Sequence, residues 1–168
     1  MRHGKPSATV VFRLAMYAVV LAIHSWLRWA TLLVGVGASV NALCDPLPRS
    51  ERPPGARWDT FFMLAIDFQV LFGLILYFGL SPFTKEALQD FGASLRDPAL
   101  RFWAVEHIAA MAAAVVLVRV GRVLALNAKT PAARRLRRSV CFAAATLLMM
   151  AAIPWPGLSH GRPLFRGL

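Results

Sequence analysis

Four long apolar stretches, each near or above the length of about 20 residues that a helix needs to cross a membrane, constrain this chain most. They cover residues 14–43, 61–80, 102–122 and 140–158. Apolar and polar residues do not alternate within them, as they would in the strands of a membrane barrel. Hydrophobic residues make up 58% of the 168 residues, more than a soluble domain of this size can bury. The sequence therefore predicts one all-α domain, an integral membrane four-helix transmembrane bundle.

Helix-breaking residues separate the four stretches. The first stretch is longer than one span requires, so we expect it to tilt or to begin as an interfacial helix near Tyr17. Residues 86–95, between the second and third stretches, are expected to add a short surface helix. The breakers are the prolines of the first loop (Pro46, Pro48, Pro53 and Pro54), Ser81-Pro82 after the second stretch, and Pro154 and Pro156 at the end of the fourth.

The basic residues lie between the apolar stretches and predict an orientation. The first and third loops carry nine of them and the second loop carries three, which places the first and third loops in the cytoplasm and both termini outside. The nine are Arg49, Arg52, Arg57, Arg122, Lys129, Arg134, Arg135, Arg137 and Arg138; the three are Lys85, Arg96 and Arg101. We therefore interpret the net charge of +11 as an orientation signal in a membrane protein surrounded by lipid, and not as a nucleic-acid surface. Cys44 and Cys141 then lie near the reducing face, where we expect free thiols.

Two histidines fall at one depth of the predicted bundle. His24 lies 19 residues before Leu43, about 28 Å along a helix, and His107 lies five residues after Phe102, about 8 Å. Because the first and third helices both descend from the outer face, both histidines lie in the outer half of the membrane. Two imidazoles at one depth on separate helices suit axial ligation of a haem iron in the bundle core. Met111, one turn below His107, is an alternative axial ligand.

Further polar residues inside the spans require partners, since each ionisable group costs about 2.5–3.5 kcal/mol to insert. Arg28, Asp67, Gln69 and Glu106 are expected to form a buried polar network. Arg28 lies near the depth of Glu106, so we expect an ion pair between them, or one that reaches Asp67. One turn from His24, Arg28 could also neutralise a haem propionate. The alanines at 109, 110 and 112–114 would give a flat macrocycle room, or would only let helices pack closely.

Four motifs stand out along the chain: HSWLRW at 24–29, DFQVLFGLILYF at 67–78, EH at 106–107 and RPLF at 162–165. Their order and spacing resemble those of small bacterial four-helix membrane proteins labelled cytochrome b-like. The resemblance runs from His24 to Arg166, and the long segment before His24 departs from it. It implies location in a bacterial inner membrane and b-type haem, with His24 and His107 as the positions of axial ligation.

No nucleophile–base pair, phosphate loop, CxxC or HExxH pattern indicates an independent enzyme. The leading hypothesis is a b-type cytochrome-like subunit that transfers electrons near the outer membrane face, between quinol and a redox partner. A proton or metal transport or assembly subunit that uses the buried His/Glu/Arg cluster is the alternative. A purely structural subunit is a third possibility. His3 and His160 lie outside the spans, where terminal histidines are usually solvated, and are assigned no role.

Overall fold

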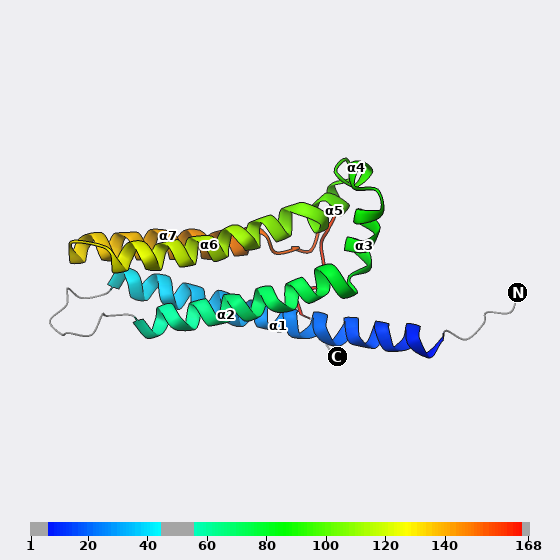
Figure 1. The fold of residues 1–168 in the computed structure, drawn as a ribbon, viewed down its shortest axis with the longest axis horizontal. Helices are drawn as coiled ribbons and strands as arrows, with labels where there is room; N and C mark the ends of the chain where they lie inside the picture. Colours follow the sequence, from blue (N-terminus) through cyan, green and yellow to red (C-terminus); the bar gives the residue numbers. More distant parts are fainter. Residues whose placement is uncertain (1–6, 45–55, 166–168) are drawn as a thin grey trace, which may run out of the picture.

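The structure is a computed structural model that describes residues 7–44 and 56–165, and the regular elements within these residues are all helices (Figure 1). The prolines and the basic residues Arg49 and Arg52 of the first loop lie outside the described residues, as do His3 and Arg166. The α-helices are α1 (Ala8–Cys44), α2 (Ala56–Ile75), α3 (Pro82–Gln89), α4 (Phe91–Ser94), α5 (Pro98–Arg101), α6 (His107–Leu126) and α7 (Pro131–Ala151). Two short π-helices complete the order: η1 (Leu76–Leu80) continues α2, and η2 (Phe102–Glu106) leads into α6.

The four long helices lie side by side in two layers. α1 packs against α2 and α7, and α6 packs closely against α7 but less closely against α2. Figure 1 shows the α1–α2 layer and the α6–α7 layer together at one end and apart at the other, where α3 stands across the gap. The core lies between the layers and includes Phe62, Ile66, Val118 and Phe142.

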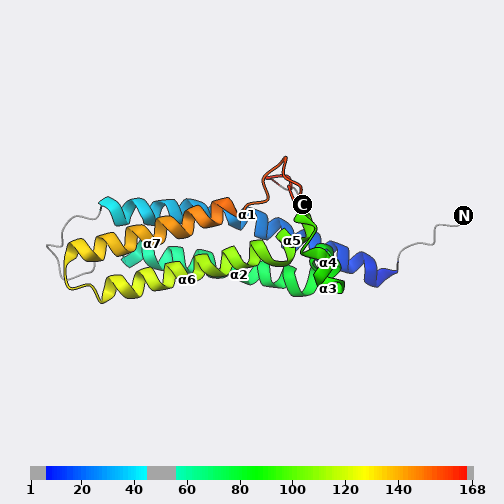
Figure 2. The same cartoon turned by 90° about the horizontal axis from the view of Figure 1, so that it is seen from above.

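Three of these helices are apolar and long enough to cross a membrane: Ala8–Cys44, Arg57–Leu80 and Pro98–Leu126. The first is one continuous helix of 37 residues, about 55 Å long, and its N-terminal turns project beyond the others (Figure 2). The chain is therefore all-helical with three candidate membrane spans in its described part.

The fourth long helix differs from the predicted span of 140–158 at both ends. α7 begins at Pro131, so the four arginines expected in a loop occupy its first turns. Thr130 caps the helix by accepting a hydrogen bond from the Ala133 amide at 3.1 Å. This cap explains why the helix begins before the polar, arginine-rich residues. α7 ends at Ala151 because Pro154 disfavours helical backbone just before it, and residues 152–158 are not helical.

The segment between η1 and η2 forms three short helices and not the single one expected over residues 86–95. Ser81-Pro82 and Asp97-Pro98 start α3 and α5, each with a capping side chain followed by proline at the first helical position. Asp90 ends α3 and caps α4, and its Oδ1 accepts from the Ala93 amide at 2.9 Å. These caps explain why the chain turns sharply between η1 and η2.

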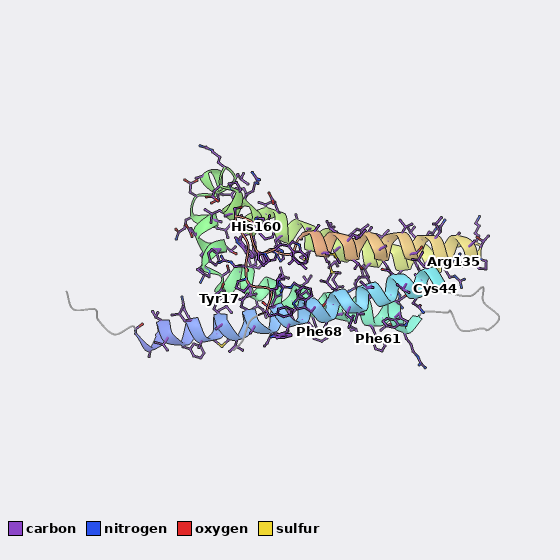
Figure 3. The ribbon with its side chains drawn as sticks, turned by 180° about the vertical axis from the view of Figure 1, so that it is seen from behind. Tyr17, Cys44, Phe61, Phe68, Arg135 and His160 are labelled. Carbon is purple, nitrogen blue, oxygen red and sulfur yellow. The ribbon has the colours of Figure 1, made fainter. Side chains whose placement is uncertain are left out.

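A buried ion pair holds α7 to α2 at the opposite end. Arg138 donates to the Asp59 carboxylate at 2.7 Å, and their side chains are 2% and 9% exposed. Arg138 also lies 3.5 Å from the Asn41 side-chain oxygen in α1. Figure 3 shows Arg135 of α7 and Cys44 of α1 at this end, hereafter the arginine end, and Tyr17 and His160 towards the other.

Candidate cofactor site

A cavity of about 530 Å³ lies between the two layers where they diverge. Its volume is within the range of about 300–1,000 Å³ typical of small-molecule and cofactor sites. Most of its lining residues are apolar, and they come from α1, α2, η1, α3, η2, α6, α7 and the segment after α7. His24, Arg28, Gln69, His107 and Arg162 are among its polar lining residues. The cavity therefore gathers five polar residues from four separate segments: α1, α2, α6 and the segment after α7.

The two histidines of the predicted site face one another in this cavity. Their ring centroids are 6.4 Å apart and the ring planes are inclined by 72°. His24 comes from α1, and His107 is the first residue of α6. The two rings thus lie at one level of the bundle, on helices from opposite layers.

His107 is oriented by the end of α7. Its Nδ1 donates to the carbonyl oxygen of Ala152 at 2.9 Å. That carbonyl is free to accept because α7 has just ended and its last carbonyls have no partner within the helix. In the neutral imidazole, Nε2 then keeps its lone pair, the arrangement typical of a metal-ligating histidine with a backbone partner.

His24 is held by α2. Its Nε2 lies 3.3 Å from the side-chain nitrogen of Gln69. His24 Nδ1 and Gln69 Oε1 are buried without a hydrogen-bond partner in the part of the chain that the structure describes. Gly73 makes room for the ring, since a Cβ there would lie 3.2 Å from His24 Cε1. The His24 ring therefore packs closely against α2, and its Nδ1 makes no hydrogen bond to the described residues.

An aromatic wall formed by the π-helix η2 adjoins His107. The ring centroids of Phe102 and Trp103 lie 5.6 Å and 6.0 Å from that of His107. Tyr77 of η1 donates to the Ala104 carbonyl of η2 at 2.7 Å, which joins the two π-helices. Trp103 also lines the cavity. Short π-helical segments in proteins often occur at functional sites.

His160 departs from the expectation that it is solvated. Its ring stacks on Phe102, with centroids 3.6 Å apart and planes 8° apart, and its Nδ1 is buried. Burial lowers the pKa of the His160 imidazole, against the opposing effect of the Glu106 carboxylate. The sequence analysis missed this contact because it considered only depth along straight helices. After Pro154 and Pro156 the chain turns back towards η2, and residue spacing does not predict such a turn.

Two arginines reach the cavity from different directions. Arg28 donates to the Leu164 carbonyl at 2.6 Å, and Trp29 donates to the same oxygen at 3.2 Å. Arg162 lies over the Phe83 ring of α3, with its Cζ 4.0 Å from the ring centroid. Phe165 stacks on Trp29 with centroids 5.5 Å apart. The RPLF segment thus borders the cavity and brings a second cation, Arg162, that the sequence had not placed there.

The expected ion pair between Arg28 and Glu106 is wrong, and so is the alternative with Asp67. Glu106 pairs with Arg101 at 2.6 Å, and Asp67 pairs with Arg119 at 2.6 Å. Consecutive helical residues face directions about 100° apart, so Glu106 points outward when His107 faces the cavity. Asp67 and Gln69 are likewise on different faces of α2, and the network expected from their depths divides into separate contacts.

The methionine and the alanines that were expected near the haem do not all reach the cavity. Met111 and Ala112 line the cavity, whereas Ala114 is buried in the core. No group of three or more His, Cys, Asp or Glu side chains that could hold a metal ion occurs among residues 7–44 and 56–165. A haem iron needs only two axial ligands from the protein, because the macrocycle supplies the rest.

No protein-family model, curated protein or solved structure matches this chain. The resemblance to cytochrome b-like membrane proteins therefore remains an expectation from the four motifs, and the functional argument rests on the cavity itself.

Proposed function

We propose that this protein is a four-span membrane protein that binds b-type haem between His24 and His107 and serves as an electron-transfer subunit. α7 is the fourth span. Its residues 140–151 carry no charge, and it packs between α1 and α6. The arginines of its first turns lie at the end that also holds Cys44, and the excess of basic residues favours that end for the cytoplasm (Figure 3). Both termini then lie outside.

The separation of the two imidazoles is the observation that supports haem. Their ring centroids are 6.4 Å apart. Because an imidazole nitrogen bonds a metal ion at about 2 Å, His24 and His107 are close enough that both would hold one iron. Gly73 leaves room for the His24 ring beside α2.

The chain's own residues would orient the ligands and exclude water. The Ala152 carbonyl holds the His107 ring, and the Gln69 amide contacts the His24 ring. Arg28 and Arg162 line the cavity and would bind the acidic groups of the macrocycle through charge-assisted hydrogen bonds. The haem would supply one-electron chemistry, and the mostly apolar lining would keep bulk water away from it.

The absorption spectrum of the purified protein tests this proposal. Protein expressed with adequate haem should show a Soret band and sharp α and β bands on reduction, as expected for iron with two strong-field axial nitrogens. His24→Ala or His107→Ala should give a high-spin spectrum or no haem. His160→Ala is the matched control and should keep the low-spin bands. Folded protein without a Soret band after added haem, or unchanged bands in either ligand variant, would contradict the proposal.

A further inference from the structure

An ion pair lies on the outside of the bundle, between α2 and α6. Arg119 Nη2 contacts both carboxylate oxygens of Asp67 at 2.6 Å. The two side chains are 43% and 42% exposed, so the pair is not part of the core or of the cofactor cavity. Neither residue contributes to the proposed haem site.

The depth of this pair is unusual for charged groups that face lipid. Asp67 lies near the middle of the candidate span Arg57–Leu80, about 15 Å from one end and 20 Å from the other. Arg119 lies about 10 Å from the end of α6, but its side chain reaches Asp67 instead of the nearer interface. Ionisable groups inside a membrane almost always face a protein interior or a water-filled cavity. The half-exposed pair therefore indicates that protein covers this face.

The surface around the pair has the spacing of a helix-packing face. Leu64 and Leu71 flank Asp67 along α2, and Val116 and Val123 flank Arg119 along α6, at alternating intervals of three and four residues. These four side chains are 49%, 50%, 57% and 56% exposed, respectively. We call the six residues the α2–α6 face.

The same face carries a rim of the cofactor cavity. Leu74 and Val116 line the cavity and are also 38% and 57% exposed, and α2 and α6 are the less closely packed neighbours. In Figure 2 the two helices lie side by side along one edge of the molecule. A chain that packed here would cover the ion pair and this side of the cavity together.

We propose that the α2–α6 face binds a second copy of this chain, related by a twofold axis parallel to the helices. The inference rests on the membrane placement made above. The face is self-complementary in charge, since it carries one carboxylate and one guanidinium side by side. A twofold axis near the pair brings Arg119 of each copy towards Asp67 of the other and forms a neutral ring of four charges. Symmetric association of this kind is the commonest form of oligomer.

Cysteine cross-linking in membranes tests the location of the interface. The proposed axis sets each α2 diagonally across from the α2 of the other copy, beyond the reach of a disulfide. In a Cys44→Ser, Cys141→Ala background, Leu71→Cys should therefore give cross-linked dimers with a bismaleimide long enough to join two diagonal helices. Leu147→Cys, on the exposed side of α7, is the matched control and should give at least tenfold less. Carbonate extraction of the same membranes reports whether the protein is integral. Integral protein without a Leu71→Cys cross-link, or with equal cross-linking at Leu147→Cys, overturns the dimer alone; extractable protein overturns the membrane placement.

Charge exchange tests the four-charge ring. Asp67→Arg and Arg119→Asp should each lower the dimer yield of Leu71→Cys at least tenfold, because four like charges would then meet at the axis. Co-expression of the two variants with different tags should restore a cross-linked heterodimer, which misfolded single variants would not do. The combined Asp67→Arg, Arg119→Asp protein should dimerise as the parent does. Undiminished homodimers of the single variants, or no heterodimer on co-expression, would overturn the proposal.

Discussion

The position of the Arg162 side chain is fixed by contacts with residues far away in the sequence. Its guanidinium lies over Phe83 and within 5.6 Å of the Trp103 ring centroid, so aromatic side chains from α3 and η2 hold it beside the cavity. Arg28 enters from α1 and is tied to the same RPLF segment through the Leu164 carbonyl. Two cations at one cavity are suited to a ligand with two carboxylates.

Arg162→Leu should weaken the binding of haem about tenfold or more, because one charge-assisted contact to a propionate is lost. The affinity for haem dimethyl ester, which has no free carboxylate, should change little. Titration of apoprotein with each compound, followed at the Soret band, measures both. Arg96→Leu, an exposed arginine in the segment after α4, is the control. Equal weakening for both compounds would show that Arg162 only supports the fold.

At the scale of elements, the ends of helices decide the site more than their centres do. The end of α7 at Ala151 supplies the carbonyl that orients His107, and η2 sets the direction in which α6 begins. At the arginine end, Asp59 and Arg138 join α2 to α7 in a setting with almost no exposure. Glu106 and Arg101 form a pair of similar length that is about half exposed.

These two ion pairs should contribute very differently to stability. Asp59→Leu removes the carboxylate that pairs with the buried Arg138 and should cost about 3–5 kcal/mol. Glu106→Leu, at the exposed pair, should cost no more than about 1 kcal/mol. Thermal unfolding in detergent measures both, and Asp59→Leu combined with Arg138→Leu should recover much of the first loss. A large loss for Glu106→Leu that Arg28→Leu restores would instead support the pairing expected from the sequence.

The two ends of the molecule differ in structure. The arginine end holds the short turn between α6 and α7, and the other end holds α3, α4 and α5 (Figure 1). The cofactor cavity is lined in part by Phe83 and Thr84 of α3. The long α1 continues past that end, with Val11, Phe12 and Leu14 exposed.

Cysteine accessibility should distinguish the two ends in intact cells. Lys129→Cys should be protected from a membrane-impermeant maleimide, because the loop between α6 and α7 is expected in the cytoplasm. Lys85→Cys, in α3, should be labelled. Both positions are exposed, so a difference reports sidedness and not burial. Labelling of Lys129→Cys and protection of Lys85→Cys would reverse the orientation and move the proposed haem to the inner half.

The sequence by itself determined the helical class, the apolar stretches and the common level of His24 and His107. These depend on composition and on distance along a helix, and both follow directly from the order of the residues in the sequence. It also indicated that proline would end the fourth helix, since the restriction before proline is local, but α7 ends at Ala151, before the predicted residue 158.

Only the tertiary structure decided which side chains meet. Depth says nothing of the direction around a helix, so Arg28, Asp67 and Glu106 could be placed at plausible heights and still be assigned the wrong partners. Arg119 and Arg162 were missed because the first points to a neighbouring helix and the second belongs to a segment that folds back. The cavity arises for the same reason: α3 to α5 hold the two layers apart at one end, and this spacing is a property of packing and not of any single stretch of sequence.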